Sequence, residues 1–246
     1  MLKTDEHFEP LGNGIEVIVS KIHRFGTDTV LLADFSKPKE WENACELGSG
    51  CGAISFIWCR EKPPKHITAV ELQSDGADMI SRGAKHNGLE SRIDVLNEDL
   101  RNLSVLTPGS FDVVACNPPY KQQGGGIINP EQGKLLARHE YTCTIEDVCK
   151  SAARLLRFGG RLCICQRPER LSDIICAMRE SGIEPKRLRL VQQRKNKAPK
   201  LFLIEGKKGG RSGGLVVNDT LLIEDESGGL SDEMIEIYGD YKTGHI

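Results

Sequence analysis

Residues 46–52 read ELGSGCG, and they lie between an apolar stretch of strand length, Ala44–Leu47, and a helical stretch over about Gly52–Arg60. Glycines at a strand-to-helix turn let the backbone approach a ligand closely, next to the N-terminus of the helix. A dinucleotide-binding turn has the spacing G-x-G-x-x-G, whereas this turn has G-x-G-x-G after an acidic residue. The stretch predicts a ligand-binding turn in an α/β fold, and an ordinary glycine-rich turn is the alternative.

Apolar stretches of strand length alternate with helical periodicity after this turn, which is the pattern of a parallel sheet. We expect seven core strands, at Ala44–Leu47, His66–Glu71, Arg92–Leu96, Phe111–Cys116, Arg161–Gln166, Arg187–Gln192 and Lys200–Glu205. We expect further helices from the N-cap residue Ser74 to Gly88, from a capping box of Thr144 and Asp147 to Gly159–Gly160, and over about Pro168–Gly182. The pattern predicts an α/β fold built on one mostly parallel sheet.

The N-terminal residues depart from this alternation. Gly14–Lys21 predicts a strand that pairs with Phe8–Leu11 in a hairpin, and Asp28–Phe35 predicts a short apolar helix. We therefore expect residues 1–40 to form a small cap on a core that comprises residues 41–208.

The C-terminal residues are set apart by their charge. Residues 186–211, the basic segment, hold ten basic residues and one acidic residue, whereas residues 215–246 hold eight acidic residues and one lysine. We expect residues 209–246 to form an acidic extension with two short strands around Asn218–Asp219 and a helix near Ser231–Tyr238. The net charge of −2 hides this segregation, which favours a partner that carries phosphate groups.

The composition is that of an ordinary globular protein of 246 residues, with 39% apolar and 28% charged residues. These values exclude collagen-like, coiled-coil and wholly disordered chains. No stretch approaches the roughly 18 consecutive apolar residues that span a bilayer, and the polar N-terminus is no secretory signal, so we expect a cytoplasmic protein without a membrane partner. The nine cysteines show no C-x-x-C pair and no zinc spacing, so we expect buried reduced thiols and no metal.

Acidic residues follow two of the predicted strands. Glu71 ends the second strand, where a carboxylate can accept hydrogen bonds from a pair of ribose hydroxyls. Asp99, with Leu100 after it, follows the third strand. Glu71 therefore predicts a ligand contact, with an exposed strand-end acid as the alternative, and for Asp99 a helix cap is the alternative to a ligand contact.

Residues 117–120 read NPPY and follow the fourth predicted strand. Pro118 and Pro119 fix the backbone and leave carbonyl groups without competing amide donors. Asn117 offers an amide oxygen and Tyr120 an aromatic face, which together suit a planar substrate with an amino group. Hydrogen bonds from that group to the Asn117 oxygen and the Pro118 carbonyl would orient its nitrogen and favour a pyramidal form. A rigid turn after a strand is the alternative.

The glycine-rich turn resembles the S-adenosylmethionine motif of Rossmann-like class I methyltransferases, and NPPY resembles the motif of amino-methyltransferases. Two further stretches narrow the resemblance: FGTD at residues 25–28 followed by VLLA at 30–33, and ARHE at residues 137–140. Together they resemble the bacterial tRNA-1-Val adenosine-37 N6-methyltransferase family over about residues 8–205. The resemblance implies a seven-stranded, mostly parallel sheet whose last strand, Lys200–Glu205, runs antiparallel to the others.

The resemblance also implies roles for individual residues. The implied S-adenosylmethionine contacts are Phe25, Asp28, Glu46, Gly48, Ser49, Gly50, Gly52, Glu71, Leu72, Asp99, Leu100 and Asn117. The implied catalytic residues are Asn117, Pro118, Pro119 and Tyr120, and the residues expected to contact RNA are Arg138, His139, Arg194, Lys195 and Lys197. For Phe25 and Asp28 the alternative to a cofactor contact is a structural role, as a hydrophobic staple and a helix cap. For Arg138 and His139 the alternative to an RNA contact is a position at the exposed end of a helix.

The expected reaction is methyl transfer to the exocyclic N6 amino group of an adenosine in tRNA, where loop bases are partly unstacked and flip out more easily than in a duplex. Two other functions stay open. Glutamine methyltransferases that act on release factors share NPPY, although they usually carry a substantial N-terminal helical domain. A catalytically silent RNA-binding protein of the same fold is the other alternative, and the sequence assigns no oligomeric state.

Overall fold

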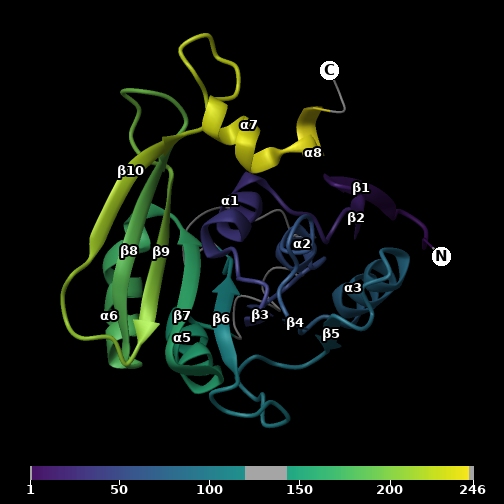
Figure 1. Ribbon diagram of the computed structural model, residues 1–246, viewed down its shortest axis with the longest axis horizontal. Coiled ribbons are helices and arrows are strands. Elements are labelled where there is room, and N and C mark those ends of the chain that lie inside the picture. Colours follow the sequence, from purple (N-terminus) through teal and green to yellow (C-terminus); the bar gives the residue numbers. More distant parts are fainter. Residues whose placement is uncertain (1, 120–142, 244–246) are drawn as a thin grey trace, which may run out of the picture.

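Eight strands form one sheet across the described residues, 2–119 and 143–243, of the computed structural model (Figure 1). In chain order they are β3 (Asn43–Leu47), β4 (His66–Val70), β5 (Ile93–Leu96), β6 (Phe111–Cys116), β7 (Leu156–Gln166), β8 (Ile183–Gln192), β9 (Leu201–Lys208) and β10 (Val216–Leu222). Their order in the sheet is β10-β8-β9-β7-β6-β3-β4-β5. The strand β9 is antiparallel to β7 and β8, and the other neighbouring pairs are parallel. The mostly parallel α/β sheet and the antiparallel direction of Lys200–Glu205 are thus confirmed.

The number of strands differs from the expected seven because the C-terminal extension adds an eighth. The expectation of two short strands around Asn218–Asp219 is wrong, since Val216–Leu222 forms one strand that pairs in parallel with β8. Asparagine and aspartate are common in turns, which suggested a break at this point. They are tolerated here because β10 lies at the edge of the sheet, where it is mostly exposed and only Leu221 is buried.

Helices connect the parallel strands. They are α2 (Ala53–Ile57), α3 (Ser74–His86), α5 (Ile145–Leu155) and α6 (Leu171–Glu180), with a short 3-10 turn at Pro168–Arg170 before α6. The capping box is confirmed, because the backbone N–H groups of Thr144 and Asp147 each donate to the other side chain, at 3.0 and 3.3 Å. The N-cap of α3 is Gln73 rather than Ser74, so that prediction is wrong by one residue.

The end of α5 also differs from the prediction. The helix ends at Leu155, and β7 begins at the next residue and contains both Gly159 and Gly160. At this point β7 holds extra residues relative to its neighbour β6. A Cβ on Gly160 would lie 3.1 Å from the carbonyl oxygen of Asp112, and Gly159 has a φ of +79°. The two glycines therefore form a bulge, and in a sequence a bulge gives the same signal as a helix C-terminus.

The N-terminal and C-terminal elements meet on one side of the sheet. The predicted N-terminal hairpin is confirmed as β1 (His7–Gly12) and β2 (Ile15–Val19), and the short helix as α1 (Thr27–Ser36). The predicted C-terminal helix is confirmed as α7 (Asp232–Tyr238), which is followed by α8 (Asp240–Thr243). Figure 1 shows α7, in yellow, next to α1, and α8 contacts β1.

The core is formed by two hydrophobic clusters on opposite faces of the sheet. One contains Ala44 of β3 and residues of α1, α2 and α3, and the other contains Cys45 and Leu47 of β3 and residues of α5 and α6. This division follows from the alternation of side chains along a strand. All nine cysteines are free, but the expectation that they are buried holds for only seven, because Cys143 is half-buried and Cys176 is exposed. Burial raises the pKa of thiols such as those of Cys45 and Cys163 far above its ordinary value.

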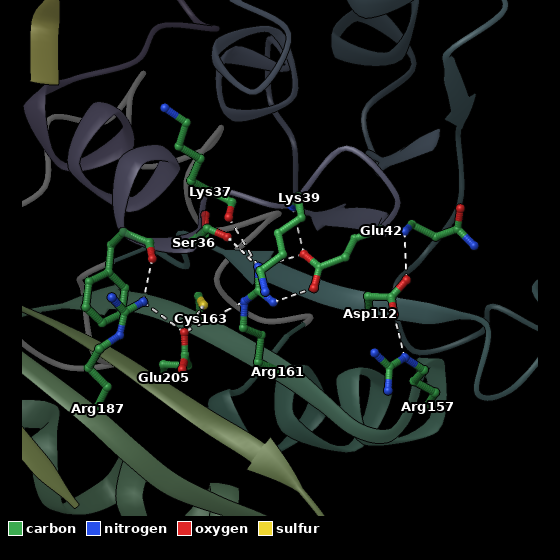
Figure 2. A network of polar contacts seen from close by, with 12 residues as sticks. Ser36, Lys37, Lys39, Glu42, Asp112, Arg157, Arg161, Cys163, Arg187 and Glu205 are labelled. Atoms are coloured by element: carbon green, nitrogen blue, oxygen red, sulfur yellow. Dashed lines mark hydrogen bonds and ion pairs between the residues drawn. The ribbon is translucent and has the colours of Figure 1, made fainter. Parts of the chain in front are cut away.

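A network of polar contacts ties the C-terminal end of α1 to the sheet (Figure 2). The Arg161 guanidinium of β7 donates to both carboxylate oxygens of Glu42, at 2.8 and 2.9 Å. Arg187 of β8 donates to the Phe35 carbonyl at 2.6 Å and to the Glu205 carboxylate at 2.8 Å. Burial acts to raise the pKa of Glu42, but the hydrogen bonds from Arg161 and from the backbone N–H of Lys39, together with the charge of Arg161, outweigh burial and lower this pKa. The network therefore fixes the C-terminal end of α1. It thereby restricts the direction of the helix axis and the position of the first turn.

Candidate functional site

A cavity of about 540 Å³ opens at the carboxyl ends of β3, β4 and β6. Nine residues that the sequence predicts at the site contribute to its lining: Gly48, Gly50, Glu71, Leu72, Asp99, Leu100, Asn117, Pro118 and Pro119. Ligands of open α/β sheets bind outside the carboxyl ends of the strands, and small-molecule cavities occupy roughly 300–1,000 Å³. The fold therefore brings the glycine-rich turn, the strand-end acids and Asn117–Pro119 together around one cavity of ligand size.

The glycine-rich turn forms one wall of this cavity. Gly48 and Gly50 have φ angles of +69° and +56°, and no atom of the described residues lies within 4 Å of the position that a Cβ would take. Glycine adopts such angles without strain, and its missing side chain leaves the space open. Gly52 also has a positive φ, but a Cβ there would lie 2.9 Å from Ile80 in the interior. Ser49 is buried, and its hydroxyl donates to backbone carbonyls, so Ser49 and Gly52 shape the turn from behind.

Glu46 supports the turn from the protein side and is not among the described residues that line the cavity. Its carboxylate accepts hydrogen bonds from the backbone N–H of Ser55, at 2.9 Å, and from the Ser55 hydroxyl, at 2.5 Å. Burial raises the pKa of Glu46 from 4.5 to about 7, although the hydrogen bonds from Ser55 act in the opposite direction. Glu46 therefore links the end of β3 to α2.

Glu71 links the same turn to β4 and faces the cavity. One carboxylate oxygen accepts the backbone N–H of Gly50 at 2.7 Å, and the other accepts that of Gln73 at 2.8 Å. Each carboxylate oxygen has a second lone pair, so Glu71 can hold the turn and still accept a hydrogen bond from a ligand. Its two bonds also orient the carboxylate plane before any ligand arrives.

Asp99 lines the cavity near the end of β5. Its carboxylate pairs with the guanidinium of Arg101, whose Nε donates to both oxygens at 3.0 Å. The hydrogen bonds from Arg101 lower the pKa of Asp99 against a smaller opposing effect of burial. Asp99 is therefore a fixed acceptor at the rim, and the apolar side chains of Leu72 and Leu100 lie in the same lining.

Asn117 lies at the end of β6, where its amide contacts the first turn of α1. The amide nitrogen donates to Asp28 Oδ2 at 3.0 Å and to Thr29 Oγ1 at 3.2 Å. The carbonyls of Pro118 and Pro119 both lie 3.4 Å from the side-chain nitrogen of Gln166, a buried residue at the end of β7. These contacts hold Asn117 and the following carbonyls at the cavity from two sides.

Five further predicted residues are not seen to line the cavity, for two different reasons. Phe25 packs against Tyr241 with 5.9 Å between ring centroids, and Phe25 and Asp28 are not among the described cavity-lining residues. Tyr120, Arg138 and His139 lie outside the described residues. Sequence reasoning missed the cavity-lining residues Lys21 and Ile22, and it missed Thr29 and Gln166 behind Asn117. A signal existed only for Gln166, a polar residue at the end of an apolar strand.

The family model described as methyltransferase small domain matches residues 23–177, which include the first turn of α1, the glycine-rich turn and Asn117–Pro119. This chain belongs to the methyltransferase small domain family. The match spans most of the chain, and it excludes the C-terminal acidic extension.

Relatives of this methyltransferase carry the name tRNA1(Val) (adenine(37)-N6)-methyltransferase. The protein from Porphyromonas gingivalis ATCC 33277 is 25% identical over 230 residues, which cover 89% of each chain. The protein from Shewanella sp. MR-4 is 24% identical over 237 residues, which cover 96% of this chain and 95% of the relative. The protein from Bacteroides thetaiotaomicron is 29% identical over 142 residues, which cover 57% of this chain and 58% of the relative.

Solved structures show the same fold at low identity. A predicted O-methyltransferase from Agrobacterium tumefaciens superposes with a TM-score of 0.70 at 22% identity, covering 87% of this chain and 97% of that one. TYW2 of M. jannaschii, solved in complex with AdoMet, has a TM-score of 0.56 at 12% identity, covering 84% of this chain and 87% of that one. The Rossmann-like class I methyltransferase fold is therefore confirmed.

The basic segment of the methyltransferase is faced by the acidic extension. In the loop between β8 and β9, Arg194 pairs with Glu224 at 2.6 Å and Lys195 with Glu226 at 3.6 Å. Because β8 runs in the same direction as β6, this loop lies at the cavity edge of the sheet. The third predicted cation, Lys197, is an exposed residue of the same loop. The two opposite charge blocks seen in the sequence thus contact each other.

Two further properties bear on the class of protein. Within the described part of the chain, no helix is long and apolar enough to cross a membrane. In the same residues no group of three or more histidine, cysteine, aspartate or glutamate side chains is placed to hold a metal ion.

Proposed function

We propose that this methyltransferase uses S-adenosylmethionine to methylate the N6 amino group of adenosine 37 in tRNA-Val. The observation that carries the proposal is the position of Asn117 and Pro118, which line the same cavity as Gly48 and Gly50. A nucleobase amino group bound by the first pair would therefore face a ligand bound by the second pair.

The residues of the cavity fit S-adenosylmethionine. Gly48 and Gly50 leave open space beside the backbone for its methionine end, and the pre-oriented carboxylate of Glu71 suits its ribose hydroxyls. Leu72 and Leu100 offer apolar contacts for its adenine ring, and Asp99 is an acceptor for the adenine amino group. When bound, this cofactor supplies an electrophilic methyl group on a sulfonium centre.

The task of Asn117 and Pro118 follows from the chemistry of the substrate nitrogen. The lone pair of an adenine amino group is delocalised into the ring, so the nitrogen is a weak nucleophile. Hydrogen bonds from its two N–H groups to the Asn117 oxygen and the Pro118 carbonyl favour a pyramidal nitrogen whose lone pair points out of the ring plane. This is catalysis by orientation and electrostatics, and Tyr120 is proposed to stack on the base.

The named relatives support the choice of substrate. The proteins from Porphyromonas gingivalis and Shewanella, which align over nearly the whole chain, are both named for adenine 37 of tRNA1(Val). Position 37 lies in an anticodon loop, where a base can leave its stack at small cost. A tRNA substrate also supports the cytoplasm as the place of action.

Three of the proposed RNA contacts lie at the cavity edge of the sheet. Arg194, Lys195 and Lys197 lie in the loop after β8, and Arg138 and His139 are proposed to act from the segment between β6 and α5. Because Arg194 and Lys195 pair with the acidic extension, RNA phosphates would have to replace or share those ion pairs. Lys197 is an exposed residue of the same loop that makes no ion pair with the described acidic residues, so it can contact a phosphate directly.

The proposal is tested by methylation of tRNA from a bacterial strain that lacks this protein. Purified protein and S-adenosylmethionine should produce N6-methyladenosine at position 37, detected by mass spectrometry of nucleosides and of nuclease fragments. Asn117→Ala should lower the single-turnover rate by about 10²- to 10³-fold, as for the loss of one group that stabilises the transition state. Asn102→Ala, at an exposed asparagine that is not in the cavity lining, should behave as wild type.

The same assay separates the alternatives. Methylation of a glutamine in a release factor, with unmodified tRNA, would assign the protein glutamine N5-methyltransferase activity. Binding of tRNA without binding of S-adenosylmethionine would assign a catalytically silent RNA-binding role.

A further inference from the structure

The two ends of the Asn117 amide differ in chemistry although they have nearly the same shape. The oxygen accepts hydrogen bonds and the NH2 group donates them, and a half-turn of the amide exchanges the two. A nucleobase amino group presents N–H donors, so only the oxygen end can bind it. The orientation of this one side chain therefore decides whether the site accepts an amino group.

The first turn of α1 selects one of these orientations. The Asn117 nitrogen donates to Asp28 Oδ2 at 3.0 Å and to Thr29 Oγ1 at 3.2 Å. A carboxylate has no hydrogen to donate, so the reversed amide would place the Asn117 oxygen against an oxygen of Asp28. A hydrogen bond to a carboxylate is also about twice as strong as one between neutral groups.

The turn that carries Asp28 is held in place from the far side. The hydroxyls of Thr27 and Tyr238 are 2.9 Å apart, so the C-terminal extension contacts the residue just before Asp28. At the other end of α1, Arg161 and Arg187 donate to the backbone carbonyls of Lys37 and Phe35, at 3.2 and 2.6 Å (Figure 2). An aspartate in the first turn is further stabilised by the helix dipole.

We propose that Asp28 is a positioning residue, which holds the amide of Asn117 with its oxygen directed toward the amino group of the substrate. Asp28 acts through Asn117, in contrast to the cofactor contact that the family resemblance implies. The inference rests on the proposed function in one respect, since it requires a substrate that offers an amino group.

A first test reads the amide directly and needs no activity. In 15N-labelled protein the side-chain NH2 signals of Asn117 are assigned by their absence in Asn117→Ala. Hydrogen exchange of these signals with water should be slow in wild type and in Asp34→Ala, at the far end of α1, and at least tenfold faster in Asp28→Ala. Exchange that is unchanged in Asp28→Ala would overturn the proposal.

A second test measures the coupling between the two residues. Asp28→Ala should lower the single-turnover rate at saturating S-adenosylmethionine by about 10- to 100-fold, which corresponds to loss of a hydrogen bond to a charged group. Calorimetry should show an unchanged affinity for the cofactor. In the Asn117→Ala background the same substitution should change the rate by less than about twofold, because its effect runs through Asn117. Asp28→Asn can still accept the bond and should lie between Asp28→Ala and wild type.

The outcomes separate the two proposals. Equal rate losses in both backgrounds would show that Asp28 matters only for the local structure, and lost cofactor affinity with an unchanged rate would make it a cofactor ligand. Either result overturns the positioning role. If wild-type protein methylates no tRNA, the proposed function fails, and the exchange measurement still decides the role of Asp28.

Discussion

Glu46 and Glu71 are two buried carboxylates beside one glycine-rich turn. They differ in the groups that donate hydrogen bonds to them and in whether they face the cavity. Glu46 accepts from Ser55 behind the turn, whereas Glu71 accepts from Gly50 and faces the cavity. The resemblance at ELGSGCG implied a ligand contact for Glu46, and the position of Glu71 at the end of a predicted strand indicated one for Glu71. The contact of Thr29 with Asn117 joins residues 88 positions apart, and no local pattern indicates such a partner.

Gly50 is expected to be essential for cofactor binding but not for folding. Valine at this position would carry a β-branched side chain at a φ of +56° and would fill the open space that faces the cavity. Gly50→Val should abolish S-adenosylmethionine binding in calorimetry. Gly14→Val is the matched control, since Gly14 has a φ of +75° and open space but lies in the hairpin turn between β1 and β2. Normal binding by Gly50→Val would remove the turn from the cofactor site.

Glu46 should make the protein less stable as the pH rises. Its pKa is about 7 in the folded protein and near 4.5 when exposed, so between these values the folded state binds more protons than the unfolded state. Stability therefore falls from about pH 4.5 to 7, with a slope of up to about 1.4 kcal/mol per pH unit. Urea unfolding from pH 5 to 8 should show this loss in wild type and a flatter profile in Glu46→Gln. Parallel profiles would contradict the buried protonated carboxyl.

At the level of helices and strands, the errors share a cause. Each came from a residue that serves two kinds of structure, such as Gly159–Gly160 in the bulge of β7 or Asn218–Asp219 in the edge strand β10. The correct elements, such as β3 with its glycine-rich turn or the capping box of Thr144, are defined by residues adjacent in the chain. Whether such glycines form a bulge or end a helix depends on pairing with a neighbouring strand, and that strand is distant in the sequence.

The ion pair that ties β7 to the segment before β3 should contribute strongly to stability. Glu42 is 7% and Arg161 21% exposed at the side chain, so Arg161→Met would leave a buried carboxylate without its bidentate partner. The free energy of unfolding should fall by about 3–5 kcal/mol, as for other broken buried pairs. Lys62→Met removes an exposed pair with Glu40 and should change it by less than about 1 kcal/mol. Urea unfolding measures both, and equal small effects would show that the Arg161 pair is effectively solvated.

Over the whole molecule, basic and acidic residues are segregated into separate blocks, although the net charge is only −2. The sequence indicated a basic and an acidic block, and the fold sets Glu224 and Glu226 against Arg194 and Lys195. The sequence could not indicate this pairing, because it depends on the edge position of β10. An RNA would therefore meet a basic loop whose charge is already partly neutralised.

The acidic residues should accordingly weaken RNA binding and the basic loop should promote it. Replacing Arg194, Lys195 and Lys197 by glutamine should flatten the salt dependence of tRNA affinity, by about 0.7–0.9 in log–log slope for each phosphate that no longer meets a cation. Glu224→Gln with Glu226→Gln should raise the affinity. The double variant Lys62→Gln with Lys65→Gln is the control for loss of charge. These lysines precede β4 and therefore lie at the amino ends of the parallel strands, away from the cavity. A wild-type slope in the triple variant would show that the loop is only a solvated surface.

The contact between Tyr238 and Thr27 has a consequence for how the protein is made. The ribosome synthesises the hairpin and α1 well before α7, yet α7 supports the first turn of α1. A nascent chain that ends after β9 already contains every described residue that lines the cavity, but it lacks the tyrosine that braces the turn next to Asn117. Full competence for methyl transfer is therefore expected to arise only after α7 has been translated, and termination before α7 yields a cavity whose key asparagine is poorly supported.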